Sequence, residues 1–309
     1  MAKHRMSLLA AIVAAVIFFI ITMVFTALAA SGYSTGNISD KYVTEITPAG
    51  WTFAIWGIIY CFLATLLVYV FIGVFRKNAY GYIYCSPAVL PHGFFVCWCL
   101  NLTLNVAWLL LWDRSLMIAA LVFLILIVLT NYAMIFFSCH GLQSYGAWLN
   151  KYHRVDLWLH RVLIQNGVAI YATWTTIASL VNLTIVLVDN AKMSNPDAAL
   201  VSLCVLTVVL LVWFVLENTV LDKHVRYILS IYPSVIWAIT GVFSKNYVAQ
   251  LPSRSNKFVV SLLAIACVMC AVRLALVIWR HIKKPYYNDV DPDDMTPIEI
   301  AQKQKKIFK

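Results

Sequence analysis

Long apolar runs, separated by short polar connections, follow one another along the whole chain. Eight of these runs reach or approach the roughly 20 residues that a helix needs to cross a bilayer. None shows the alternation of apolar and polar positions that is typical of membrane β-strands. The pattern predicts an all-α integral membrane protein with helices over residues 7–30, 51–75, 94–112, 116–138, 162–188, 198–216, 227–243 and 258–279.

The composition excludes an ordinary soluble protein. Of the 309 residues, 62% are hydrophobic and 12% are charged, and the mean hydropathy is +0.83. A soluble domain is about 45–50% apolar and about 25% charged. The surplus of apolar surface must therefore face lipid. The run at 227–243 is the shortest and contains Pro233, a residue that a spanning helix can tolerate.

The distribution of basic residues predicts the orientation. Lysine and arginine are enriched in cytosolic connections of membrane proteins. With eight crossings and a cytosolic N-terminus, most basic residues of the connections lie on the cytosolic side, among them Arg76, Lys77, Lys151, Arg154 and Arg226. We therefore expect both termini in the cytosol. The net charge of +10 suits an anionic membrane face and requires no nucleic-acid partner.

Catalytic and metal chemistry have little support in the sequence. Most of the eight cysteines lie inside expected helices, unlike the framework of a secreted disulfide-rich domain. Cys97 with Cys99, and Cys267 with Cys270, lack the histidine partners that would complete a tetrahedral site. No nucleophile stands beside a base, and no carboxylates form a pair. We expect neither an enzyme nor a metal site.

Polar and aromatic side chains recur at helical spacing in three of the runs. Residues three, four or seven positions apart share one face of a helix, and polar groups at membrane depth are costly enough to mark sites. Each run therefore predicts one polar–aromatic stripe. The stripes are Phe53, Trp56 and Tyr60; Asn101, Asn105, Trp108 and Trp112; and Tyr171, Trp174, Ala178 and Asn182.

Two interpretations of these stripes remain open. Amide side chains can hold helices together inside a bundle, with aromatic rings filling the core between them. Alternatively, the rings and amides can line a cavity, since stacking supplies affinity and hydrogen bonds orient a ligand. In that case the expected ligand-binding residues are Trp51, Phe53, Trp56, Tyr60, Asn101, Asn105, Trp108, Tyr171, Trp174, Ala178 and Asn182.

The stripes resemble motifs of the TspO/MBR family, the translocator or tryptophan-rich sensory proteins. The resemblance covers five segments in order over residues 7–188. Its motifs are Pro48…Trp51-x-Phe53…Trp56-x-x-x-Tyr60, Leu102-x-Leu104-Asn105-x-x-Trp108 and Tyr171-x-x-Trp174-x-x-x-Ala178-x-x-x-Asn182. It implies a five-helix bundle around a pocket for flat hydrophobic ligands, with porphyrin, haem or a sterol as the ligand. The later helices resemble those of a longer tryptophan-rich branch.

The expected organisation has three parts. They are a five-helix bundle over residues 1–188, additional transmembrane helices over 189–282 and a polar cytosolic tail over 283–309. In the tail, Thr296 and Glu299 have the spacing to cap one short helix.

Arg273, inside the last apolar run, is the one basic residue that we place at membrane depth, where charge suggests function. It could also snorkel to the inner face or pair with Glu217, the partner that we expect.

Three functions therefore remain open. The first is binding, carrying or sensing a hydrophobic planar ligand. The second is transport of a small solute along a path that includes Arg273. The third is a structural role in a membrane assembly. A homo-oligomer is compatible with each of them.

Overall fold

Two groups of long helices make up the fold. The computed structural model describes residues 5–32, 35–247, 253–287 and 296–307. The first group is α1 (Met6–Gly32), α3 (Ile55–Phe75), α4 (His92–Asp113), α5 (Met117–Tyr152) and α7 (Gly167–Asp189). The second group is α8 (Asn195–Asn218), α10 (Ile231–Asn246) and α11 (Arg254–Lys283).

Short elements connect these helices at the two ends of the molecule. At one end lie α2 (Thr35–Lys41) and the 3₁₀ segment η1 (Gly50–Ala54), which leads into α3. At the other end lie the hairpin of β1 (Lys77–Asn78) and β2 (Gly81–Tyr82), α6 (Arg154–Leu159), the π-helical segment η2 (His160–Asn166), α9 (Asp222–Val225) and α12 (Pro297–Ile307). We call these the α2 end and the α12 end.

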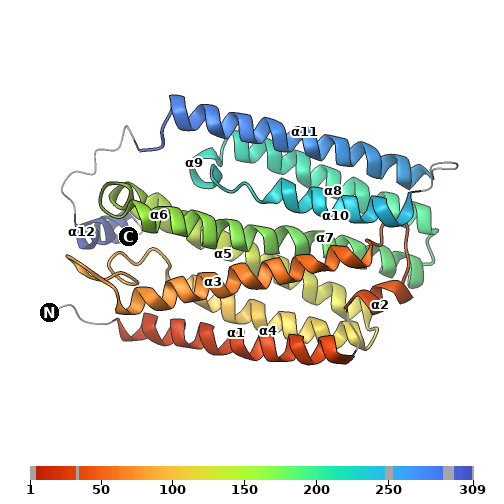
Figure 1. The fold of residues 1–309 in the computed structure, drawn as a ribbon, viewed down its shortest axis with the longest axis horizontal. Coiled ribbons are helices and arrows are strands. Elements are labelled where there is room, and N and C mark those ends of the chain that lie inside the picture. The colour runs from red at the N-terminus through yellow and green to blue at the C-terminus, as the bar shows by residue number, and fades with distance from the viewer. Residues whose placement is uncertain (1–4, 33–34, 248–252, 288–295, 308–309) are drawn as a thin grey trace.

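The long helices run roughly along one axis and form layers (Figure 1). Helices α1 and α4 lie on one side, α3, α5 and α7 in the middle, and α8, α10 and α11 on the other side. Helix α7 joins the two groups, because it packs against α3 and α5 and also against α8 and α10. One apolar core runs through both groups, from Leu8 on α1 to Leu262 on α11.

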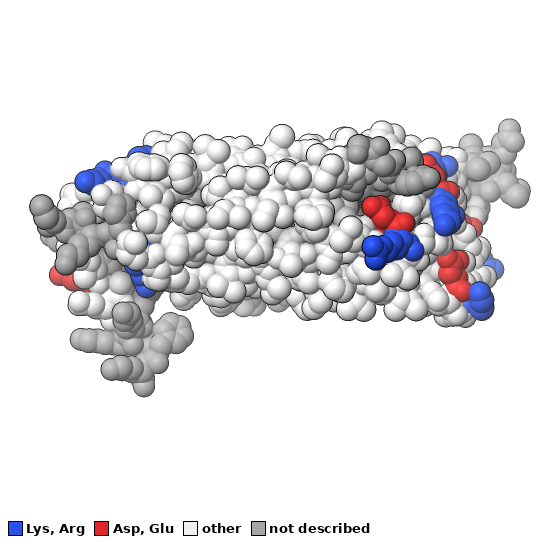
Figure 2. Space-filling view, turned by 90° about the horizontal axis from the view of Figure 1, so that it is seen from below, with Lys and Arg blue, Asp and Glu red and all other residues white. Residues whose placement is uncertain are grey.

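The surface fits a membrane environment. Seven helices within the described residues are long and apolar enough to cross a bilayer. Charged side chains gather toward the two ends of the molecule in Figure 2, and a broad band between them carries none on this face. Together these features confirm the expected all-α, multi-pass membrane fold. The helix predicted at 227–243 does form, but as α10 it has only 16 residues.

The segment at 139–161 differs from expectation. The helices expected at 116–138 and 162–188 left a connection between them, but α5 continues to Tyr152 and α6 follows after a single residue. The reason is burial, because Leu142, Trp148 and Leu149 form an apolar cluster with Leu157 of α6. This cluster gives the last turns of α5 a core of their own beyond the membrane-spanning part.

The start of α10 also differs from expectation, because residues 226–230 form a turn followed by a short irregular stretch. The side chain of Asn166 in η2 holds this stretch. Its amide nitrogen donates to the carbonyl oxygen of Tyr227 at 2.8 Å, and its oxygen accepts from the N–H groups of Leu229 (2.8 Å) and Ser230 (3.1 Å). One amide thus satisfies one carbonyl and two N–H groups just before α10, where the first N–H groups of a helix have no partner within the helix.

Asn166→Ala is expected to destabilise the protein by about 2 kcal/mol, because buried backbone groups lose their partner. Unfolding in mixed detergent–SDS micelles, followed by tryptophan fluorescence, measures this change. Asn190→Ala is the matched control, since Asn190 is exposed at the end of α7 and should change stability by less than about 0.5 kcal/mol. Equal effects of the two substitutions would contradict the role of Asn166.

The polar tail is partly described. Residues 288–295 and 308–309 lie outside the described residues. The expected short helix forms as α12, and its first turn is capped as the sequence predicts. The backbone N–H of Thr296 donates to Glu299 Oε2 at 2.6 Å, and the N–H of Glu299 donates to Thr296 Oγ1 at 3.4 Å. Ile300 packs against the apolar cluster at the end of α5.

Candidate ligand pocket

An apolar pocket lies near the α2 end, where α3, α4, α7 and α10 meet. Its free volume is about 40 Å³, room for a few water molecules at most. A larger ligand can therefore bind only if side chains move. We call it the aromatic pocket, and its lining is Ser39, Pro48, Phe53, Trp56, Trp108, Trp112, Leu124, Trp174, Ile177, Ala178, Val181, Ala238 and Val242.

Trp56 is the centre of the aromatic side chains at this pocket. Its ring stacks on Trp108, with centroids 5.7 Å apart and an interplanar angle of 27°, and on Tyr60 at 5.7 Å and 23°. The edges of Tyr171 and Trp174 meet it at 5.9 and 6.4 Å. Such pairs are favourable by about 0.5–1.5 kcal/mol beyond area burial, so the rings hold one another in place.

Two indole groups at the pocket lack hydrogen-bond partners. Trp108 and Trp174 are each 3% exposed, and within the described part of the chain no acceptor bonds to either indole N–H. A buried donor without an acceptor costs about 1–3 kcal/mol. The pocket therefore has an apolar aromatic surface, and two of the rings that line it carry donors without a partner.

A polar group lies directly beneath the stacked rings. The Asn105 amide nitrogen donates to the hydroxyl of Tyr171 at 3.0 Å, and its oxygen accepts from the hydroxyl of Tyr60 at 3.4 Å. These three residues come from α4, α7 and α3 and do not line the pocket. They tie the helices together one turn below Trp56 and Trp108, and so fix the floor of the pocket.

The remaining predicted residues lie elsewhere. Asn101 donates to Thr130 (2.8 Å) and to Asn131 (3.1 Å) of α5, which joins α4 to α5. Asn182, in the orientation that satisfies both of its amide atoms, contacts the first turn of α5. Trp51 is 46% exposed, and its ring meets the edge of Trp237 at 4.9 Å. Of the eleven predicted residues, the pocket lining contains Phe53, Trp56, Trp108, Trp174 and Ala178.

Helix α10 completes the pocket, which the sequence did not reveal. Ala238 and Val242 form part of the lining. The same helix also holds the segment that leads into α3. The Trp237 indole donates to the carbonyl oxygen of Thr52 at 2.9 Å, and the N–H of Ala49 donates to the carbonyl oxygen of Gly241 at 3.0 Å. Small apolar residues on a helix carry no sequence signal for this role.

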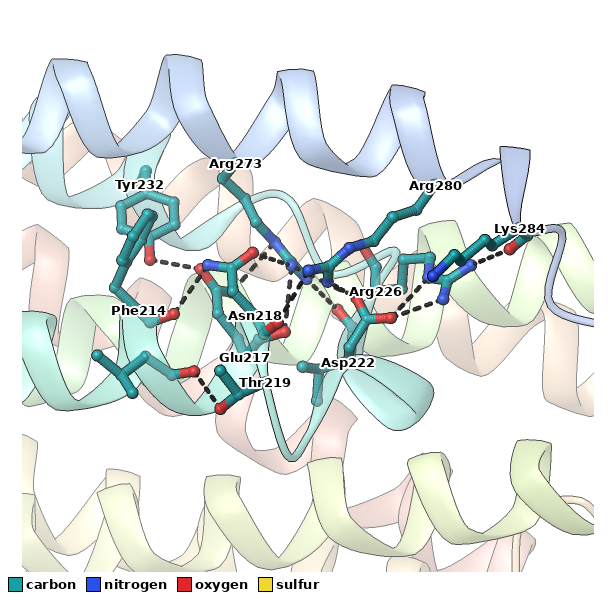
Figure 3. A network of polar contacts seen from close by, with 12 residues as sticks. Phe214, Glu217, Asn218, Thr219, Asp222, Arg226, Tyr232, Arg273, Arg280 and Lys284 are labelled. Atoms are coloured by element: carbon teal, nitrogen blue, oxygen red, sulfur yellow. Dashed lines mark hydrogen bonds and ion pairs between the residues drawn. The ribbon is translucent and has the colours of Figure 1, made fainter. Parts of the chain in front are cut away.

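A group of buried charged and polar residues lies toward the α12 end, between α8, α9 and α11 (Figure 3). Arg273 of α11 is 1% exposed and Glu217 of α8 is fully buried. Their side chains form the expected ion pair, with Arg273 Nε 3.4 Å from Glu217 Oε2. The hydroxyl of Tyr232 donates to Glu217 Oε1 at 2.5 Å, which links the first turn of α10 to this pair.

Arg273 also donates hydrogen bonds to backbone carbonyl groups where the chain turns between α8 and α10. Its guanidinium donates to the carbonyl oxygens of Glu217 (3.2 Å), Val225 (3.1 Å) and Arg226 (3.3 Å). It donates as well to the side chain of Asn218 at 2.9 Å. These contacts satisfy the carbonyl groups at the end of α8 and α9, so the geometry is that of a structural clamp.

Asp222 of α9 extends the network toward the surface. Arg226 donates to one of its carboxylate oxygens at 2.6 Å and Arg280 to the other at 2.6 Å. Burial by itself raises the pKa of Asp222, but the hydrogen bonds and charges of these two arginines outweigh it and hold the pKa below its usual range. The carboxylate is therefore charged at neutral pH.

Comparison with known protein families gives a match. A family model described as TSPO-like protein matches residues 8–280, a range that includes α8, α10 and α11 as well as the first five long helices. Searches of curated proteins and of solved structures found no match. Within the described residues, no group of three or more histidine, cysteine or acidic side chains is placed to hold a metal ion.

Proposed function

This chain belongs to the TSPO-like protein family, and we propose that it binds a hydrophobic planar ligand, such as a porphyrin or a sterol, in the aromatic pocket. The observation that carries the proposal is the pair of buried, unpartnered indole N–H groups of Trp108 and Trp174 at an apolar pocket. A flat ligand with an acceptor at its edge would stack on the rings and receive these donors.

Binding requires the pocket to enlarge. Its free volume of about 40 Å³ is far below the roughly 300–1,000 Å³ of a typical small-molecule site. Trp56 is only partly buried and stacks on Trp108, so movement of its large side chain would enlarge the pocket. The ligand would then replace the ring–ring contacts that Trp56 makes in this state.

We also propose that the protein binds its ligand without catalysing a reaction, and that it has a defined orientation in the membrane. The pocket is lined by aromatic and aliphatic side chains with a single hydroxyl, that of Ser39, which suits binding more than bond chemistry. The basic residues Arg76, Arg154 and Arg226 lie at or beside the α12 end elements, so we place this end, and both termini, in the cytosol.

Transport of a small solute is the less favoured alternative. It would require Arg273 to exchange partners during passage, yet its hydrogen bonds hold the turn between α8 and α9. A purely structural role in an assembly would give the aromatic pocket no ligand. Flux of a solute into proteoliposomes that is abolished by Arg273→Gln would favour transport over binding.

Saturable quenching of tryptophan fluorescence by porphyrins is the expected result for the purified protein in detergent, with sterols detected by displacement of the porphyrin. Trp108→Phe should weaken binding about tenfold, or about 1.4 kcal/mol, because it removes a donor and part of the stacking surface.

Trp279→Phe is the matched control, since Trp279 is 51% exposed on α11 and should leave affinity unchanged. Quenching that never saturates, or an equal loss in both variants, would overturn the proposal.

A further inference from the structure

A second cavity lies beside the aromatic pocket, on the other side of α7 and α10. It has about 30 Å³ of free volume and is lined mainly by α7, α8, α10 and α11. Among the described residues that line it, none is aromatic. We call it the aliphatic chamber, and the residues that line it without touching the aromatic pocket include Leu180, Ser202, Leu203, Leu206, Ile239 and Val259.

The two cavities share part of their walls. Ile177 and Val181 of α7, with Ala238 and Val242 of α10, line both. The partition is thus made only of short aliphatic side chains, and one of them is an alanine. Rotation of Ile177 or Val181 to another rotamer changes this partition without breaking any hydrogen bond, which is a small step compared with moving a helix.

The chamber offers a bound molecule only dispersion contacts. Its polar side chain is Ser202, whose hydroxyl is 2.6 Å from that of Thr184 and donates to the carbonyl oxygen of Leu180 at 3.1 Å. That hydroxyl is therefore already satisfied. A saturated hydrocarbon chain matches such a lining, whereas the polar edge of a ring system would lose its hydrogen bonds there.

We propose that the ligand carries an aliphatic chain, which passes between α7 and α10 into the aliphatic chamber while its ring system lies in the aromatic pocket. The chamber, with about 30 Å³ of free volume, must enlarge on binding, as the aromatic pocket must. This inference rests on the proposed function. It gives α8, α10 and α11 a specific role, because they form most of a subsite that the first five long helices alone would lack. It also narrows the ligand class to planar rings with a hydrocarbon substituent.

The test compares ligands that differ only in the chain. Suitable porphyrins are the mono-ethyl and mono-hexadecyl esters of protoporphyrin, and suitable sterols are androst-5-en-3β-ol and cholesterol. Leu206→Phe places an aromatic ring in the chamber. Val259→Phe places one there from α11 and serves as a second variant if the first folds poorly. Leu210→Phe is the control, because Leu210 is buried on the same face of α8 but lines neither cavity.

Leu206→Phe is expected to lower the affinity for the long-chain ligand about tenfold, since overpacking costs about 1–3 kcal/mol. The short-chain ligand should keep its affinity within about twofold in the same variant. Leu210→Phe should leave the affinity for both ligands unchanged. If Leu206→Phe and Val259→Phe affect long and short chains equally, the chain lies in the lipid and the inference is overturned. If no ligand of either pair saturates the wild-type protein, the proposed function itself is overturned.

Discussion

Arg273→Met is expected to destabilise the folded protein by about 3–5 kcal/mol, the range found when one partner of a buried ion pair is removed. The substitution leaves the carboxylate of Glu217 fully buried, with Tyr232 as its remaining hydrogen-bond donor. It also leaves the carbonyl groups of Val225 and Arg226 without the bonds that Arg273 now donates. Titration with SDS in mixed micelles, followed by tryptophan fluorescence, measures the loss.

Arg280→Met provides the matched control on the same helix. Its side chain is 19% exposed and also binds Asp222, but water can replace its contacts, so we expect a loss of about 1 kcal/mol or less. The double variant Glu217→Leu/Arg273→Met should be less destabilised than the sum of the single variants, because neither charge is then left alone. Additive effects, or equal losses for Arg273 and Arg280, would contradict the clamp.

Gly241→Ala is expected to cost about 3 kcal/mol and to weaken ligand binding at the same time. A Cβ atom at this position would lie 2.0 Å from Oγ1 of Thr52 and 3.0 Å from its Cβ, so α10 and η1 must separate. Overpacking of this kind costs about 1–3 kcal/mol, and loss of the bond from Trp237 to the Thr52 carbonyl adds about 1 kcal/mol.

The control for Gly241 is Gly57 of α3, where an added Cβ meets nothing within 4 Å. Gly57→Ala should stabilise the protein by about 0.5–1 kcal/mol, because alanine favours a helix interior over glycine. Porphyrin affinity should be unchanged by Gly57→Ala and reduced by Gly241→Ala. A Gly241→Ala variant with normal stability and affinity would show that α10 does not hold the segment leading into α3.

The apolar pattern was sufficient to predict the fold class and most helices. A lipid-facing helix must be apolar along its whole length, so the runs at 51–75 and 94–112 predicted α3 and α4 closely. The pattern failed where burial has another cause. The end of α5 is buried by Leu157 and Ile300, which are distant contacts that no local run of residues encodes.

The candidate pocket was predictable in part, for a geometric reason. Helical spacing tells which face of α4 or α7 a residue occupies, and the predicted face is the one that meets the pocket. Helical spacing does not show at which position along the helix axis the neighbouring helices separate and leave a pocket. Asn101 lies about 10 Å along the axis from Trp108, so it meets α5 where the helices touch, while Trp108 meets the open space. Ala238 and Val242 were missed because nothing distinguishes them from ordinary core residues.

The shortness of α10 has a consequence for how the protein is made. Its 16 residues span about 24 Å, less than the roughly 30 Å of hydrocarbon that a helix must cross. The polar groups of the non-helical backbone before it are satisfied only after Asn166 and Arg273 supply hydrogen bonds. Arg273 is synthesised later, on α11. Residues 219–246 are therefore expected to reach their final arrangement in the membrane only after α11 has been inserted.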